Sequence, residues 1–360
     1  MIPLRVEQSL FNAQAPKLIK YIDPVPPAKA HGLVAEVYNQ MRLEFQLVPP
    51  VTLHAPNPEL LAGVWGILRE TIVAGPVDRT LREVVCEAVS EINQCSFCVD
   101  AHSALLTGAA HKHTADAIHA NRPDRISDPT MRSVARWALA NREPGAEVLS
   151  HPPFSTEEAP ELIGSAVCFH YIDRMVNVFL SDSPVPLPTW LRWLRGTVIR
   201  IAGATVGKRI MAVTVEPGGA VGSLPEAQPS PEFSWAQPKS AVAAAIGRLE
   251  AVIEAEGKKA LPESVRNLVA QRVTGWHGEA PSISRSWVET AVTSLDEPDR
   301  PAGRLALLVA LAPYQVDETI IREFRDRHRS DSTLVAAAAW ASFTATRRIA
   351  GWLAPAAIAH

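Results

Sequence analysis

The stretch RTLREVVCEAVSEINQCSFCVDAH, residues 79–102, is the most informative part of this 360-residue chain. Between Arg79 and Asn93 its apolar residues recur at intervals of three and four, as one face of an amphipathic helix requires. They are Leu81, Val84, Val85, Ala88, Val89 and Ile92. The spacing predicts a helix over Arg79–Asn93. Asn93 is then the expected break before a second helix, whose first turn holds a cysteine pair.

The same helical spacing continues along most of the chain. It predicts further helices over Gly32–Phe45, Pro58–Val73, Pro129–Asn141, Glu157–Leu180, Pro188–Arg209, Ser240–Glu256, Pro262–Arg272, Ile283–Leu295, Pro301–Ala312, Asp317–Arg327 and Thr333–Leu353. Strand patterning is scarce, and Ile210–Val215 is the one short β-branched candidate. The sequence therefore predicts an all-α fold.

A segment rich in proline and glycine divides the chain. The eight such residues between Val215 and Pro238 interrupt any regular element. We therefore expect one helical domain over residues 1–200, a connection over 201–239 and a second helical domain over 240–360. Phe233 and Trp235 inside the connection favour an ordered strap pinned to the body over a free tether.

Weak similarities suggest that the two halves are copies of one unit. Residues 78–88 (DRTLREVVCEA) and 299–309 (DRPAGRLALLV) begin alike. Residues 166–180 resemble 337–351, because both place aromatic residues ahead of an arginine on one long predicted helix. The cysteine motif occurs in the first copy alone. The second copy is therefore expected to be a degenerate repeat that packs against the first.

Composition excludes several classes of protein. The 35 Lys and Arg residues against 38 Asp and Glu leave a formal charge of −3, too balanced for a nucleic-acid-binding surface. Residues 1–21 lack the apolar stretch of a secretory signal, and no apolar run approaches the roughly 20 residues that cross a bilayer. Four cysteines are too few for a disulfide-stapled scaffold, and glycine-rich phosphate loops are absent. We expect a cytoplasmic protein with no nucleic-acid partner, no membrane partner and no nucleotide cofactor.

The cysteine pair is the candidate centre of chemistry. Cys95, Cys98 and His102 stand at i, i+3 and i+7, close to one face of a helix, so their side chains can meet. A sulfur at a helix N-terminus faces unpaired N–H groups, which predicts a lowered thiol pKa. A thiolate attacks peroxide oxygen, and the sulfenic acid that forms condenses with a second thiol. His102 could relay the proton, with Glu83 orienting the imidazole if the two helices pack together.

The full pattern is Glu83, eleven residues, Cys95, two residues, Cys98, three residues and His102. It resembles that of the alkylhydroperoxidase AhpD-like family within the carboxymuconolactone decarboxylase superfamily. The resemblance implies an all-helical AhpD-like unit that reduces organic hydroperoxides. It implies Cys98 as the peroxidatic cysteine, Cys95 as its resolving and partner-facing companion, and Glu83 and His102 as the proton relay.

The resemblance also implies a homo-oligomer that an external dithiol protein re-reduces. We expect no metal and no cofactor. Superfamily members that decarboxylate the lactone generally lack the cysteine pair, which argues against that reaction here. Two features depart from the family pattern. Phe97 stands where some peroxidatic members place a histidine. The chain is also about twice the length of a single AhpD-like unit.

Other interpretations of the same residues remain open. Cys95, Cys98 and His102 offer three zinc ligands, and Cys86, His111 or His113 could supply the fourth of a zinc-stabilised scaffold. The chain could also be a redox-inactive binding or assembly module.

Residues outside the motif have plainer interpretations. We expect Cys86 and Cys168 to be core residues, and His170 and Tyr171 to form either a pocket wall or an aromatic cluster. We expect His111, His113 and His119 to be solvated, and Glu87 and Glu91 to be either exposed acids or substitutes for Glu83.

Overall fold

The computed structural model describes residues 18–184, 189–220, 224–237 and 240–354. Every extended regular element in these residues is a helix, so the predicted all-α fold is confirmed. The β-type pairings among them are two isolated bridges, Ile19 with Leu180 and Ala74 with Val215. The predicted strand Ile210–Val215 is wrong, because Ile210 belongs to helix α12 (Lys208–Met211) and Val215 alone forms a bridge. None of the described helices has both the length and the apolar character needed to span a bilayer.

Helix α5 (Arg79–Ile92) lies where the periodicity predicts it. Asp78 caps its first turn by accepting a hydrogen bond from Thr80 N–H at 2.7 Å. Asn93 follows its last turn, and Gln94 turns the chain with a left-handed φ of 54°. Helix α6 (Ser96–Gly108) then begins directly at the cysteine motif and packs against α5.

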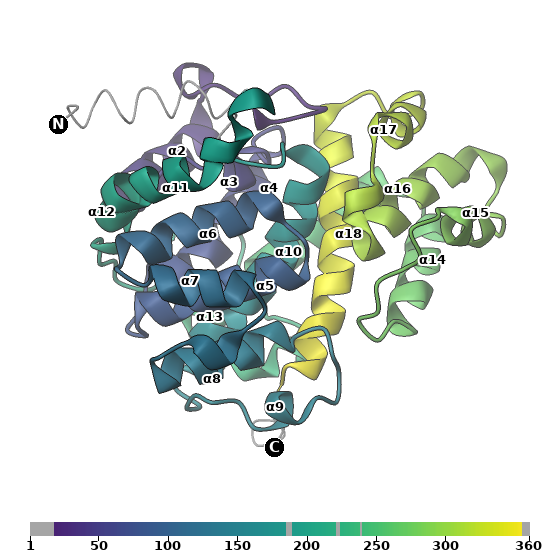
Figure 1. Ribbon diagram of the computed structural model, residues 1–360. Coiled ribbons are helices and arrows are strands. Elements are labelled where there is room, and N and C mark those ends of the chain that lie inside the picture. The colour runs from purple at the N-terminus through teal and green to yellow at the C-terminus, as the bar shows by residue number, and fades with distance from the viewer. Residues whose placement is uncertain (1–17, 185–188, 221–223, 238–239, 355–360) are drawn as a thin grey trace.

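The long helix α10 (Ala159–Phe179) occupies the middle of the molecule. Almost all of its residues are buried, because α5 packs on one side of it and α18 (Asp331–Trp352) on another. Figure 1 shows α18 standing between the purple-to-teal helices and the green helices from α14 (Glu263–Thr274) to α17 (Glu318–Arg325). The remaining helices of the first half are α2 (Gly32–Glu44), α3 (Pro49–Thr52), α4 (Pro58–Leu68), the π-helix η3 (Arg69–Val73), α7 (Lys112–His119), α8 (Pro129–Leu139) and α9 (Glu147–Ser150).

The C-terminal part repeats one packing arrangement of the first half. Its helices are α13 (Ala241–Ala260), α14 (Glu263–Thr274), α15 (Ser286–Val292), α16 (Arg300–Leu311), α17 (Glu318–Arg325) and α18. Helix α16 packs on α18 as α5 packs on α10. In sequence, α16 resembles α5 and α18 resembles α10. Both halves contribute to one cluster of buried apolar side chains. Phe233 and Trp235 are buried in that cluster, so this part of the segment packs on the body of the protein.

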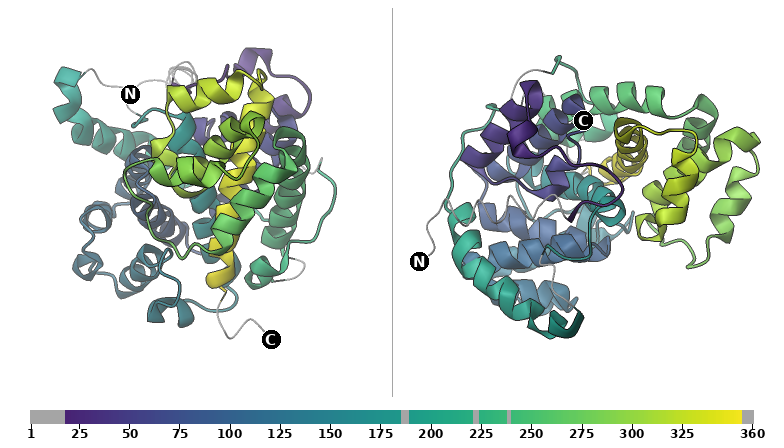
Figure 2. Two further views of the ribbon diagram at one scale, coloured as in Figure 1. Left: turned by 90° about the vertical axis from the view of Figure 1, so that its right-hand side faces the viewer. Right: turned by 90° about the horizontal axis from the view of Figure 1, so that it is seen from above.

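A broken helical segment covers the outer face of α6. The predicted helix Pro188–Arg209 is instead η5 (Thr189–Leu194), α11 (Arg195–Ala202), the π-helix η6 (Gly203–Gly207) and α12, and its first residue lies outside the described part. Figure 2 shows this teal segment along one side of the molecule. A Cβ on Gly108 of α6 would lie 2.4 Å from the backbone nitrogen of Lys208. Glycine therefore permits the close approach of η6 and α12 to α6.

Candidate active site

A buried carboxylate joins α5 to α6 at the site. Glu83 on α5 has no solvent exposure, and its Oε2 lies 2.6 Å from His102 Nδ1 on α6. Arg79 donates from Nε to the other oxygen at 2.7 Å. Burial raises the pKa of Glu83, but the charge of Arg79 and the hydrogen bond with His102 outweigh burial and lower that pKa to about 2. Glu83 is therefore ionised, and the predicted meeting of Glu83 with His102 is observed.

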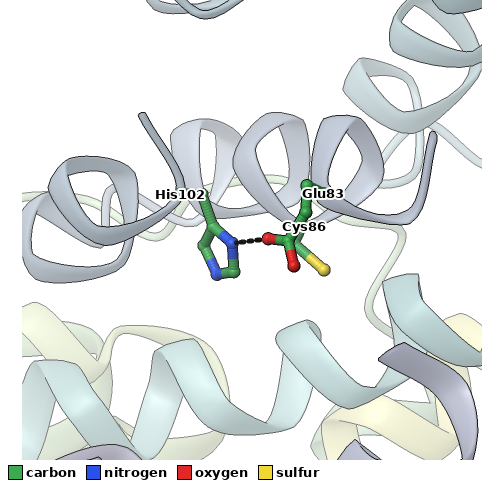
Figure 3. A group of neighbouring side chains, drawn as sticks. All are labelled: Glu83, Cys86 and His102. Atoms are coloured by element: carbon green, nitrogen blue, oxygen red, sulfur yellow. Dashed lines mark hydrogen bonds and ion pairs between the residues drawn. The ribbon is translucent and has the colours of Figure 1, made fainter. Parts of the chain in front are cut away.

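The imidazole of His102 has a defined orientation. With Nδ1 on Glu83, its Nε2 is the nitrogen that can exchange a proton with a ligand. Phe169 of α10 packs edge-to-face on the ring, with centroids 4.4 Å apart. Figure 3 shows the ring beside Glu83, with the Cys86 sulfur next to the carboxylate.

The two motif cysteines lie together at the start of α6. Cys95 is the N-cap residue of that helix, Cys98 lies in its first turn, and their sulfur atoms are 2.6 Å apart. Both thiols are reduced and almost fully buried. The pair is therefore close enough to interconvert between two thiols and a disulfide with little movement of the helix.

A cavity of about 210 Å³ opens at Cys98. Cys98, Glu83 and His102 line it together. Most of its remaining wall is apolar, with Phe45, Leu68, Ile72, Phe97, Phe169 and Ile210 among the lining residues. The cavity therefore brings an apolar molecule to one sulfur and to the Glu83–His102 pair at the same time.

Cys95 lies at a different opening from Cys98. It lines a second, more polar pocket together with Glu91, Asp100, His119 and Arg195. Arg195 of α11 binds Asp100 of α6 at 2.7 Å, which ties the covering segment to this rim. The two cysteines thus line different pockets, Cys98 the apolar cavity and Cys95 the polar pocket.

The predicted lowering of the thiol pKa values is wrong. Burial raises the pKa of Cys95 and, more strongly, that of Cys98, and the nearby carboxylate of Asp173 adds to both increases. The hydrogen bond between the thiols lowers the pKa of Cys95 and raises that of Cys98. Loss of hydration is the largest cause of both increases.

Asp173 of α10 was not identified from the sequence. One of its carboxylate oxygens and the sulfurs of Cys95 and Cys98 all lie within 4.8 Å of one another. Asp173 and Arg174 are adjacent charged residues in a largely apolar stretch of sequence. Charged residues are rarely buried without a partner, so this position was the sequence signal for a buried polar site. Its contact with residues about 75 positions earlier depends on the packing of α10 against α5.

The zinc hypothesis is not supported by this arrangement. Among the described residues, two groups of potential metal ligands occur, Glu83 with Cys86 and His102, and Cys95 with Cys98 and Asp173. The proposed ligand set of Cys95, Cys98 and His102 is thus divided between them. His111 and His113 belong to neither group.

The other singled-out residues have the following environments. Cys86 and Cys168 are fully buried, as expected for core residues. Glu87 is also fully buried, so the expectation of an exposed acid is wrong, whereas Glu91 is half-buried and pairs with His119. His170 and Tyr171 do not line the apolar cavity, and Tyr171 instead packs against the rings of His54 and Phe343.

Two comparisons with known proteins bear on this site. The profile described as "Carboxymuconolactone decarboxylase family" matches residues 58–139, which run from α4 to the end of α8 and contain the cysteine motif. A curated protein of Mycobacterium tuberculosis named alkyl hydroperoxide reductase Rv2159c is 35% identical over 342 residues. The alignment covers 95% of this chain and 96% of that protein.

Proposed function

Because the chain belongs to the carboxymuconolactone decarboxylase family, as an AhpD-like member, we propose that it is a thiol-dependent alkyl hydroperoxide reductase. The observation that carries this proposal is the apolar cavity that Cys98 shares with the Glu83–His102 pair. A hydroperoxide bound there lies against a sulfur nucleophile and an acid–base pair.

The first chemical step takes place in this cavity. His102 Nε2 takes the Cys98 proton, and Glu83, ionised and held by Arg79, stabilises the imidazolium. The thiolate attacks the terminal peroxide oxygen, the O–O bond breaks, and the imidazolium protonates the departing alkoxide. The products are an alcohol and a sulfenic acid on Cys98. Cys95, with its sulfur at 2.6 Å, then displaces water to form the disulfide.

The substrate class follows from the wall of the cavity. An apolar lining gives an alkyl or aryl group a favourable transfer from water, whereas hydrogen peroxide gains nothing from it. We therefore propose organic hydroperoxides as the preferred substrates.

The reductant and the assembly are part of the same proposal. The polar pocket at Cys95 supports an external dithiol protein as reductant, since Cys95 lines a pocket other than the substrate cavity. We also propose a cytoplasmic homo-oligomer. Residues 1–200 would form the catalytic domain, 201–239 the connection, and 240–360 a degenerate repeat that supports α10 through α18.

The test is a turnover assay with several hydroperoxides and several dithiol donors, with wild type beside Cys98→Ser. We expect the wild type to consume organic hydroperoxide and to lose two free thiols per chain. Cys98→Ser should do neither. Wild-type protein that retains all its thiols in excess peroxide would contradict the proposal.

A further inference from the structure

The carboxylate of Asp173 is placed to interact with both cysteine sulfurs. A carboxylate oxygen and the two sulfurs all lie within 4.8 Å of one another, and the acid raises the pKa of both thiols. Asp173 is completely buried, so bulk water cannot compete for these contacts. A carboxylate in this position can exchange a proton with either sulfur.

Helix α5 holds the carboxylate in place. Ser90 Oγ donates to Oδ1 at 3.1 Å, and Asn93 Nδ2 donates to Oδ2 at 2.9 Å. Asn93 Nδ2 also lies 3.0 Å from His170 Nδ1. These bonds tie the Asp173 carboxylate of α10 to α5, the helix that precedes the cysteine motif. Its orientation therefore does not depend on the thiols themselves.

Asp173 is separated from the substrate cavity. Glu83 and His102 line that cavity with Cys98, whereas Asp173 does not. The second ligand group, Glu83 with Cys86 and His102, likewise excludes it. The Glu83–His102 pair therefore lies on the substrate side, and the Asp173 carboxylate lies at the sulfur pair.

We propose, on the basis of the hydroperoxide reductase function above, that Asp173 carries the proton when Cys95 closes the disulfide. The Cys95 thiol transfers its proton to Asp173 while its sulfur attacks the sulfur of the Cys98 sulfenic acid. The S–S bond forms, the S–O bond of the sulfenic acid breaks, and Asp173 passes the proton to the departing hydroxide, which leaves as water. In this step the Cys95 sulfur is oxidised and the sulfenic sulfur of Cys98 is reduced, while the oxygen leaves as water with no change in its oxidation state.

The surroundings of Asp173 suit this role. Burial raises its pKa to about 6, although hydrogen bonds from Asn93, Cys98 and Ser90 oppose the increase. The acid is thus ionised at neutral pH and only weakly basic, which allows it to accept and return a proton. The titratable or charged groups nearest to it are Cys86 on α5, Cys95, Cys98 and His102 at α6, Cys168, His170 and Arg174 on α10, and Arg142 next to Arg174.

The test is a single turnover of wild type and Asp173→Asn with one equivalent of cumene hydroperoxide. Sulfenic acid is trapped with dimedone, and the disulfide is counted by mass spectrometry after alkylation. We expect Asp173→Asn to accumulate sulfenic acid because its disulfide step slows about 10²-fold, a typical general acid–base contribution. Raising the pH should narrow this difference, since the Cys95 thiol then ionises without the carboxylate. Disulfide formation at the wild-type rate in Asp173→Asn would overturn the inference.

A matched control separates this role from a general effect of replacing a buried acid by its amide. Glu87→Gln makes the same carboxylate-to-amide change at a buried acid that belongs to neither ligand group. It should leave disulfide formation unchanged. Equal slowing in both variants would overturn the inference.

Two further measurements keep the inference testable if a variant or the peroxidase proposal fails. If Asp173→Asn does not fold, Ser90→Ala replaces it, because loss of one hydrogen bond should raise the pKa of Asp173 and move the pH midpoint of disulfide formation upward. If wild type consumes no peroxide, the proposed function fails. The closing step can then be measured with an aromatic disulfide reagent, whose second coloured thiolate is released when the cysteine pair closes. An unchanged rate of that release in the Asp173 variant would overturn the inference independently of peroxide.

Discussion

Replacing Glu87 by glutamine should stabilise the protein at alkaline pH. Glu87 has no solvent exposure and accepts one hydrogen bond, from Ser103 Oγ at 2.6 Å. Its Oε2 has no partner among the described residues. Burial raises its pKa from the ordinary 4.5 to about 8, and the charges of Glu91 and Glu83 add to the increase. Glutamine keeps the acceptor for Ser103 and cannot ionise.

The sign follows from proton linkage. Between pH 4.5 and pH 8 the folded protein binds more protons at Glu87 than the unfolded chain does, so the stability falls as pH rises through that window. At about 1.4 kcal/mol per pKa unit, the full loss is roughly 5 kcal/mol above pH 8, and about 3 kcal/mol of it falls between pH 5 and pH 8. The Gln variant should lack this loss.

The assay is urea unfolding of both proteins at pH 5, 6, 7 and 8, followed by circular dichroism. The difference in unfolding free energy should be small at pH 5 and should grow by about 3 kcal/mol in favour of Glu87→Gln by pH 8. A difference that stays constant with pH would refute the conclusion that Glu87 is protonated in the folded state. So would a wild type that is the more stable protein at pH 8.

Three further predictions concern the site and its cover. Glu83→Gln and His102→Ala should each slow peroxide consumption by about 10²-fold in a stopped-flow assay, and unchanged rates in both would remove the relay from the mechanism. Val206→Trp narrows the cavity, so kcat/KM should fall by roughly tenfold or more for cumene hydroperoxide and much less for hydrogen peroxide; equal losses would argue against substrate binding there. Gly108→Ala places a Cβ 2.4 Å from the Lys208 nitrogen and should lower the unfolding free energy by about 1–3 kcal/mol; an unchanged Tm would show that the cover moves away freely.

Local pattern was sufficient for most of the fold. The apolar spacing between Arg79 and Asn93 marked α5 to within one residue, because a helix with one buried stripe records its period in the sequence. The expectation for Pro188–Arg209 was less accurate. The chain there breaks into four helical pieces, because Gly203 and Gly207 allow η6 to press onto α6. That close approach depends on a partner helix, which a local pattern does not describe.

The candidate site was predictable in part for the same reason. Spacing alone could place Cys98 and His102 on one helix, and the chance that Glu83 would meet His102 depended on two adjacent helices. Burial was the missing quantity. Burial reverses the expected shift of the thiol pKa values and removes Glu87 from solvent. The packing of α10 against α5 and α6 places Asp173 beside the sulfurs. Each of these depends on long-range packing.

The most direct test of the account is to locate the first oxidation. Cys95→Ser should be treated with one equivalent of organic hydroperoxide and dimedone, and the modified residue identified by mass spectrometry. The account predicts one dimedone adduct, on Cys98, the cysteine that lines the apolar cavity. An adduct on Cys86 or Cys168, or peroxide left unconsumed while wild type consumes it, would contradict the assignment of Cys98 as the nucleophile.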